Sequence, residues 1–195
     1  MKGYPTYASS AEYLKKVAEL LETLPDQGDR FVAALYEGFE RDRTIFLIGN
    51  GGSAANASHF AQDLAKGTLS SMSATRRFRV IALTDNIGFI TALANDEGYD
   101  AIFEQQLRNL AGPGDILVAI SGSGNSPNVI RAVEFAKSIG MTSIGITGFD
   151  GGKLKSLSDV SVHIPVDDMG MTEALHAVVF HLAMSQLRDR LDAAG

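Results

Sequence analysis

Cysteine is absent from all 195 residues of the sequence. Disulfide frameworks and thiolate chemistry are therefore excluded. Basic side chains are also few, with 17 Lys and Arg against 23 Asp and Glu, and the formal net charge is -6 at pH 7. Nucleic-acid surfaces depend mainly on Lys and Arg, so we expect no nucleic-acid partner. The one short basic run, at Arg76, Arg77 and Arg79, is interpreted as a solvated loop.

Long apolar runs are missing as well. No segment approaches the roughly 18 apolar residues that a membrane-spanning helix needs. Residues 1–17 lack the unbroken apolar stretch of a signal peptide. We therefore expect a cytoplasmic protein with no membrane partner. The length and the hydrophobic content of 45% suit one globular domain with a substantial core.

The first 42 residues have the pattern of two helices. Ser9 and Glu12 have the spacing of a capping box, and apolar residues then recur at helical intervals up to Pro25. A second amphipathic segment covers roughly residues 29–42. Such a helical pair either covers a sheet or packs against a partner subunit.

Five short apolar runs follow, at residues 44–48, 79–83, 115–120, 142–147 and 160–164. Near-continuous apolar strands separated by helical patterns indicate a parallel sheet covered on both faces. We predict a single α/β domain over residues 1–195. It consists of the helical pair (1–42) and a doubly wound, flavodoxin-like core (43–195) with a five-stranded parallel sheet. A long C-terminal helix, from about residue 171 to 191, closes the domain.

Glycine is concentrated after the first, third and fourth runs, in GNGGS, SGSGNSPN and TGFDGG. Ligands of an open parallel sheet bind at the carboxyl ends of its strands. The third-strand loop offers three serine hydroxyls and two glycines whose backbone amides can approach an anion, at Ser121, Gly122, Ser123, Gly124 and Ser126. The helix that begins after Ser126 aims free N–H groups at this loop. An ordinary strand-to-helix turn explains Ser126 but not the spaced serines, so we predict a phosphate site.

This loop differs from both common nucleotide loops. A Walker loop ends in Gly-Lys-Ser/Thr, which is absent, and the dinucleotide fingerprint needs a third glycine where this chain has Ala54. We therefore expect no nucleotide cofactor.

Titratable residues gather in two helical segments. His59 and Asp63 lie four residues apart and share a helix face. This spacing suits metal ligation, an imidazole oriented by a carboxylate, or a simple surface pair. The apolar C-terminal helix carries Glu173, His176 and His181, and polar residues there must face solvent or a site. The fourth histidine, His163, falls in a strand pattern, which favours a structural role.

The motifs GNGGS…HFA, ND, ISxSGNS…NVI and TGxDGG, with a C-terminal E…H…H helix, resemble the SIS (sugar isomerase) domain. More narrowly, they are similar to the phosphoheptose isomerase family, over nearly the whole chain. The resemblance implies an aldose–ketose isomerase of carbohydrate metabolism. Its reaction would convert sedoheptulose 7-phosphate to D-glycero-D-manno-heptose 7-phosphate through an enediol. It also implies a homo-oligomer, typically a homotetramer with sites between subunits.

The resemblance assigns roles to particular positions. Substrate-binding residues would be Asn50, Gly51, Gly52, Ser53, Asn95, Asp96, Ser121, Gly122, Ser123, Ser126 and Glu173. A divalent metal, zinc in some members, would be held by His59, Asp63, Glu173 and His181. Proton transfer would fall to Asp63, or Glu173 in its place, with His181 as partner. However, Glu173 and His181 lie eight residues apart, about 12 Å along a helix axis, which strains a shared metal.

The chain departs from the family pattern at several positions. The family usually has Glu where this chain has Asp63, and Gln where it has Glu173. The segment 66–79 is longer than usual, and an arginine expected after the first-loop helix is missing. These departures leave two alternatives: isomerisation of another sugar phosphate, or a non-catalytic regulator of the kind associated with the bacterial replication initiator. A regulator should have lost its acid–base residues, whereas His59, Asp63 and His181 are present.

Overall fold

A computed structural model describes residues 5–194. Five parallel strands form one sheet in the order β2-β1-β3-β4-β5. Their bounds are β1 Thr44–Gly49, β2 Arg79–Ala82, β3 Ile116–Ser121, β4 Thr142–Thr147 and β5 Val160–His163. The predicted α/β class, parallel sheet and doubly wound order are therefore confirmed.

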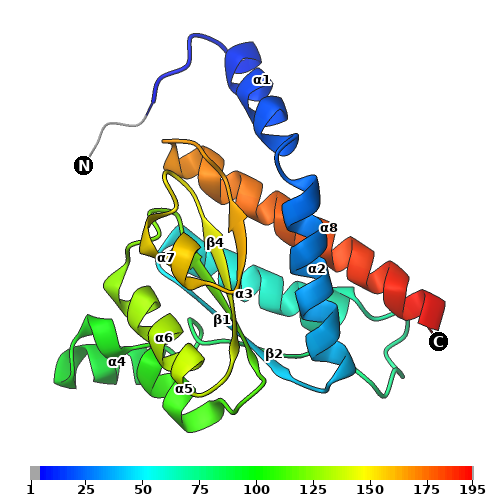
Figure 1. Ribbon diagram of the computed structural model, residues 1–195, viewed down its shortest axis with the longest axis vertical. Helices are drawn as coiled ribbons and strands as arrows, with labels where there is room; N and C mark the ends of the chain where they lie inside the picture. The colour runs from blue at the N-terminus through cyan, green and yellow to red at the C-terminus, as the bar shows by residue number, and fades with distance from the viewer. Residues whose placement is uncertain (1–4, 195) are drawn as a thin grey trace.

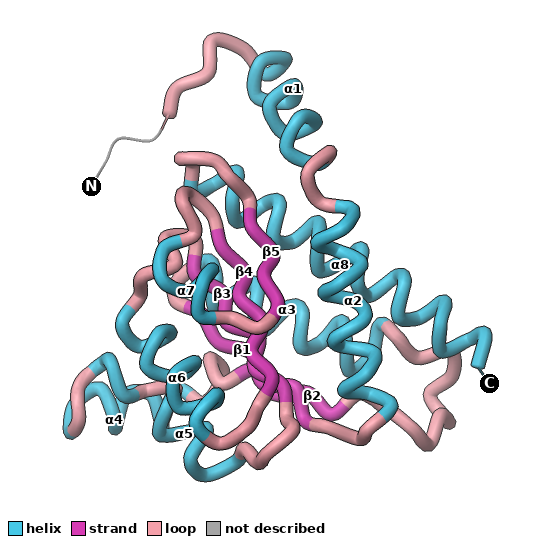
Figure 2. Tube along the Cα trace, in the orientation of Figure 1, coloured by secondary structure: helices cyan, strands magenta, loops and turns pink. Residues whose placement is uncertain are grey.

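The sheet is covered on both faces (Figures 1 and 2). Successive side chains of a strand point to opposite faces, and both β1 faces are apolar. Ile45 and Leu47 belong to the core cluster that contains α2 (Pro25–Glu40), α3 (Gly52–Gln62) and α8 (Met169–Ala194). Phe46 and Ile48 belong to the cluster that contains α5 (Glu104–Leu110), α6 (Pro127–Ser138) and α7 (Gly152–Leu157). Two-sided burial of β1, β3 and β4 explains why these strands read as continuous apolar runs, whereas the edge strand β2 is largely exposed.

The N-terminal helices are present, with one boundary different from the prediction. Ser9 caps α1 (Ser10–Leu21) by accepting a hydrogen bond from the Glu12 amide at 3.2 Å, as predicted. Pro25 does not merely end this helix. It is the first residue of α2, where its missing N–H is not needed. Helix α1 extends beyond the sheet at the top of the molecule (Figure 1).

Three further elements position side chains discussed below. Helix α3 continues into a π-helical turn, Asp63–Gly67, so Asp63 sits where the hydrogen-bonding pattern changes. Helix α4 (Ile87–Asp96) is followed by a short 3-10 turn, Tyr99–Ala101. Within the described chain, α4 has no buried residue.

The basic run lies against the body of the protein. Arg76 donates to the carbonyls of Phe39 and Glu40 at 2.8 and 2.7 Å, and its guanidinium stands 4.3 Å from the centre of the Phe39 ring. It thereby satisfies carbonyls at the C-terminus of α2. Arg76 lies in an exposed loop, as expected, but its guanidinium also binds the end of α2. Over residues 5–194, no helix combines the length and the apolar character needed to cross a membrane.

Candidate active site

The loop after β3 has the geometry of an anion cradle. Ser126 is the N-cap of α6, yet its hydroxyl makes no capping bond and lies 3.2 Å from the Ser121 hydroxyl. Gly124 has φ +64°, a conformation that glycine adopts freely. The loop therefore turns its serine hydroxyls and the N-terminus of α6 toward one space.

The TGFDGG loop (residues 147–152) follows β4 and packs against the loop after β3. The Gly148 amide donates to the Gly122 carbonyl at 2.8 Å, and the Leu154 amide donates to the Gly124 carbonyl at 2.9 Å. A Cβ on Gly124 would overlap the carbonyl of Gly151. Close backbone approach explains why both loops are rich in glycine. The TGFDGG loop thus holds the loop after β3 (residues 121–126, the serine loop) in place. It does not line the cavity itself.

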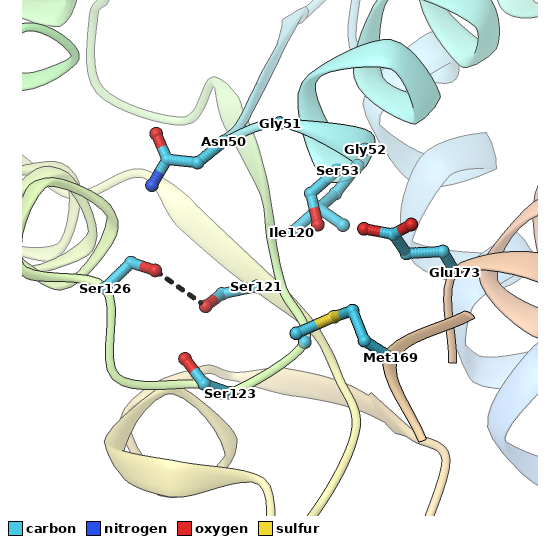
Figure 3. Close-up of a pocket in the computed structure, with 11 residues that line it drawn as sticks. Asn50, Gly51, Gly52, Ser53, Ile120, Ser121, Ser123, Ser126, Met169 and Glu173 are labelled. Carbon is cyan, nitrogen blue, oxygen red and sulfur yellow. Dashed lines mark hydrogen bonds between the residues drawn. The ribbon is translucent and has the colours of Figure 1, made fainter. Parts of the chain in front are cut away.

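A cavity of about 260 Å³ lies between the serine loop, the N-terminus of α3 and the start of α8. It is lined by Asn50, Gly51, Gly52, Ser53, Ile120, Ser121, Gly122, Ser123, Ser126, Met169 and Glu173. Glu173 faces the cavity across from Ser126 (Figure 3). A Cβ at position 52 would overlap the Glu173 carboxylate, so a larger residue there would displace this side chain from its present place. The cavity joins a polar anion cradle on one side to a carboxylate on the other.

Two turns further along α3 and α8, three titratable side chains converge. The Nε2 atoms of His59 and His181 lie 3.6 and 3.5 Å from the Asp63 carboxylate oxygen Oδ2. The two imidazole rings meet edge to face, with centroids 5.2 Å apart. Asp63 is 8% exposed, whereas both histidines are largely open to solvent. The surface-pair interpretation of His59 and Asp63 is therefore wrong.

The three side chains fit a divalent metal. The Asp63 Oδ2 atom is buried and has no hydrogen-bond partner among the described residues. A buried carboxylate oxygen without a partner is costly, and a cation would relieve this cost. One candidate ligand atom from each of His59, Asp63 and His181 lies within 4.8 Å of the others. Two imidazoles and one carboxylate are suitable ligands for zinc or a similar transition metal.

Comparison with known proteins identifies the family of this chain. A family model described as the SIS domain matches residues 10–148. The phosphoheptose isomerase of Aliarcobacter butzleri is 38% identical over 89% of this chain and 89% of its own length. That of Helicobacter pylori strain P12 is 38% identical over 90% and 88%. This chain belongs to the phosphoheptose isomerase family of SIS domains.

Solved structures of the phosphoheptose isomerase family have the same fold. The enzyme from Neisseria gonorrhoeae superposes with a TM-score of 0.83 at 33% identity, covering 91% of this chain and 93% of that one. The enzyme from Francisella tularensis gives 0.84 at 28% identity, over 90% and 92%. The resemblance inferred from the motifs is thus confirmed.

The structure gathers most of the residues that the SIS resemblance assigned to substrate. Asn50 to Ser53, Ser121 to Ser123, Ser126 and Glu173 all line the cavity. Asn95 and Asp96 do not. They lie at the exposed end of α4, where the Asn95 amide donates to the Asp96 carboxylate at 2.7 Å. Neither residue lines the cavity of its own chain.

Only three of the four predicted metal ligands come together in the structure. His59, Asp63 and His181 converge, but Glu173 is not in the group. The physical reason is the spacing along α8, since eight residues of helix separate Glu173 and His181 by about 12 Å. Glu173 instead contributes to the wall of the cavity.

Sequence reasoning missed two residues of the cavity wall, Ile120 and Met169. Ile120 looks like any other core residue in the third strand. Met169 begins α8, and Asp168 before it accepts a hydrogen bond from the Met171 amide at 3.1 Å. The Asp168–Met171 spacing is a helix-start signal that could have placed Met169 at the carboxyl edge of the sheet.

Proposed function

We propose that this protein is an aldose–ketose isomerase that converts sedoheptulose 7-phosphate to D-glycero-D-manno-heptose 7-phosphate. The observation that carries the proposal is that one cavity has an anion cradle on one side and the Glu173 carboxylate on the other. Relatives at 38% identity that cover most of the chain carry the name phosphoheptose isomerase.

The serine loop binds the phosphate. Hydroxyls of Ser121, Ser123 and Ser126 donate to its oxygens, and the N-terminus of α6 adds backbone N–H groups and a partial positive charge. This remote binding energy orients the carbon chain for reaction. An extended seven-carbon chain spans about 8 Å, from carbon–carbon bonds of about 1.5 Å. The carbonyl end of the sugar therefore lies well away from the serine loop.

Proton transfer needs a base within hydrogen-bond reach of C1 and C2. Glu173 is the carboxylate in the cavity wall, so we assign it to take the proton from C1 of the ketose and return it to C2. With no metal bound, His181, with Asp63, moves the hydroxyl proton between O1 and O2. The intermediate is the enediol, and the carbonyl passes from C2 to C1.

A divalent metal such as zinc would be held by His59, Asp63 and His181. When bound, it supplies a Lewis acid that polarises a carbonyl and stabilises an enediolate. The two histidine side chains are half exposed, so one side of this site is accessible.

The active unit in this proposal is a homotetramer with sites between subunits. Helix α4 is apolar in sequence but has no buried residue in the described chain, and Ile87 on it is 70% exposed. A second copy that covers α4 would also bring Asn95 and Asp96 to a neighbouring cavity, which explains why they do not reach their own. The cytoplasmic location stays a prediction from the sequence.

Turnover tests the function directly. Purified protein is incubated with sedoheptulose 7-phosphate, with and without added zinc, and formation of the aldose phosphate is followed by NMR. We expect conversion by the wild type and a loss of about 100-fold or more in kcat for His181→Ala, with little change in substrate binding. Binding without conversion by the wild type would instead favour a phosphosugar-binding regulator.

A further inference from the structure

The side chain of Asn50 lines the cavity but is held by two residues outside the cavity wall. Its Nδ2 donates to Asn128 Oδ1 at 2.9 Å, and Asn128 Nδ2 donates back to Asn50 Oδ1 at 2.9 Å. The Tyr99 hydroxyl donates to the same Asn50 oxygen, also at 2.9 Å. A carboxamide oxygen has two lone pairs, so both acceptor positions of Asn50 are occupied.

The backbone of α6 determines which way this pair of amides faces. Asn128 Oδ1 also accepts the Val129 amide at 3.0 Å. A backbone N–H can only donate, so the Asn128 oxygen must stay on that side, and Asn50 must turn its nitrogen toward it. Asn128 is 1% exposed, which excludes water from competing for these bonds.

One N–H of Asn50 remains after these bonds are counted. Figure 3 shows the nitrogen of Asn50 on the side of Ser126 and its oxygen turned away. We infer that Asn128 and Tyr99 are positioning residues that fix the Asn50 amide as a hydrogen-bond donor to the substrate. The substrate atom it recognises is therefore an acceptor oxygen, either of the sugar or of the phosphoryl group. This inference rests on the proposed function.

Two conservative variants remove hydrogen bonds that orient the Asn50 side chain but keep Asn50 itself. Tyr99→Phe deletes one donor to the Asn50 oxygen, at a side chain that is 53% exposed. Asn128→Asp keeps the acceptor for the Val129 amide but deletes the other donor and sets two oxygens against each other. In Asn128→Asp, the Asn50 amide can turn and present its oxygen to the cavity. In Tyr99→Phe, the Asn50 oxygen loses one of its two donors, so the amide is held less firmly in the donor orientation. We expect KM for sedoheptulose 7-phosphate to rise about 3- to 10-fold in each, the usual range for one hydrogen bond, with kcat nearly unchanged.

Matched controls separate positioning from a general loss of stability. Tyr13→Phe is the same exchange on α1, and Asn109→Asp is the same exchange at an exposed position of α5, outside α4 and outside the cavity wall. Both should keep the wild-type KM. The urea midpoints of Tyr99→Phe and Asn128→Asp are measured alongside, and a rise in KM without a lowered midpoint supports positioning. In an Asn50→Ala background, Tyr99→Phe should have no further effect on KM.

Inorganic phosphate, titrated by calorimetry, identifies the acceptor oxygen. Weaker phosphate binding by the two variants assigns the acceptor to the phosphoryl group, and unchanged phosphate binding assigns it to the sugar. The inference is overturned if both variants bind substrate and phosphate like the wild type. It is also overturned if Tyr99→Phe acts equally strongly without Asn50. If the wild type neither binds nor converts the sugar phosphate, the proposed function fails, and the phosphate titration still tests the Asn50 orientation.

Discussion

Three side-chain carboxylates are buried in the described part of the chain, and each has different partners. Glu104 is 5% exposed; burial raises its pKa, but the guanidinium groups of Arg108 and Arg131 outweigh this and hold the pKa below its usual range. Asp168 accepts the Tyr7 hydroxyl at 2.8 Å, and this bond raises the pKa of Tyr7 to about 12. Asp63 has only two imidazoles beside it. Of the three, Asp63 is therefore the carboxylate whose surroundings call for an added cation.

The affinity of the protein for zinc tests whether Asp63 and the two histidines beside it bind a metal. We expect His59→Ala and His181→Ala each to weaken zinc binding at least about tenfold, because each removes one of three ligands. Glu173→Gln serves as the matched control and should bind zinc like the wild type, since Glu173 lies outside the group. Competition with a chromophoric chelator measures the affinities. A loss of zinc affinity in Glu173→Gln equal to that in His59→Ala would contradict the division of the site.

Asp63 and Glu173 stand where the family usually has Glu and Gln, and this difference leads to a second prediction. Asp63 reaches one methylene less than the usual Glu, and Glu173 supplies the carboxylate in the cavity. Glu173→Gln alone should lower kcat about 100-fold or more, the usual contribution of a general base. The double variant Asp63→Glu with Glu173→Gln restores the usual family pattern and should recover part of that loss. Steady-state kinetics on sedoheptulose 7-phosphate decides, and full activity of Glu173→Gln would return the base role to Asp63.

Helix α8 is connected to the end of β4 through one buried histidine. His176 is 0% exposed, and its Nε2 donates to the Thr147 carbonyl at 3.1 Å. Gly148, the next residue, donates to the serine loop at Gly122. Burial lowers the pKa of His176 to about 4, so the side chain is neutral and a donor at neutral pH. His176 thus helps to fix the TGFDGG loop, which in turn is hydrogen-bonded to the serine loop.

The lowered pKa predicts how stability depends on pH. An unfolded histidine titrates near 6.5, so between pH 6.5 and about 4 the unfolded chain binds a proton at His176 that the folded chain does not. The free energy of unfolding should therefore fall by roughly 3 kcal/mol as pH falls through this window, at 1.36 kcal/mol per pKa unit. Urea unfolding at several pH values measures it. His176→Gln keeps a donor for Thr147 and should remove this component, while an unchanged slope would contradict the assignment.

The strands could be predicted from the sequence because both faces of the sheet are buried, so runs such as residues 44–48 are apolar throughout. The boundary at Pro25 was misplaced because proline both follows and begins helices. The position of Asp63 was harder to predict, since its carboxylate lies beside His181, which is 118 residues away in the chain. The position of Asn95 and Asp96 outside the cavity wall could not be predicted from local patterns, because it depends on how α4 packs against the rest of the chain.

The molecular surface retains apolar groups that a monomer would leave exposed. Leu14 on α1 is 63% exposed, and Val178 and Leu182 on α8 are 44% and 40% exposed. An apolar groove of about 210 Å³ lies beside them, between α8 and the α1–α2 junction. Together with the uncovered α4, these groups support a second copy as their partner.

The tetramer can be tested by placing a charge in these surfaces. We expect Leu182→Asp to lower the molecular mass measured by sedimentation velocity, because a buried unpaired carboxylate opposes association. Leu110→Asp is the matched control. Leu110 is also an exposed leucine, at 54%, but it is the last residue of α5 and belongs neither to α4 nor to the groove lining. Ile87→Asp on α4 should lower turnover as well as mass. A wild-type protein that sediments as a monomer would contradict the assembly.

The most direct test of the whole account is the fate of the transferred proton. The protein is incubated with sedoheptulose 7-phosphate in deuterated water, and the product is analysed by proton NMR. An enediol route through an exchangeable base predicts an aldose phosphate with deuterium at C2, with label and product both lost in Glu173→Gln. An aldose that forms in the wild type with no deuterium at C2 would contradict proton transfer by an exchangeable base. The absence of any aldose from sedoheptulose 7-phosphate would contradict the isomerase itself.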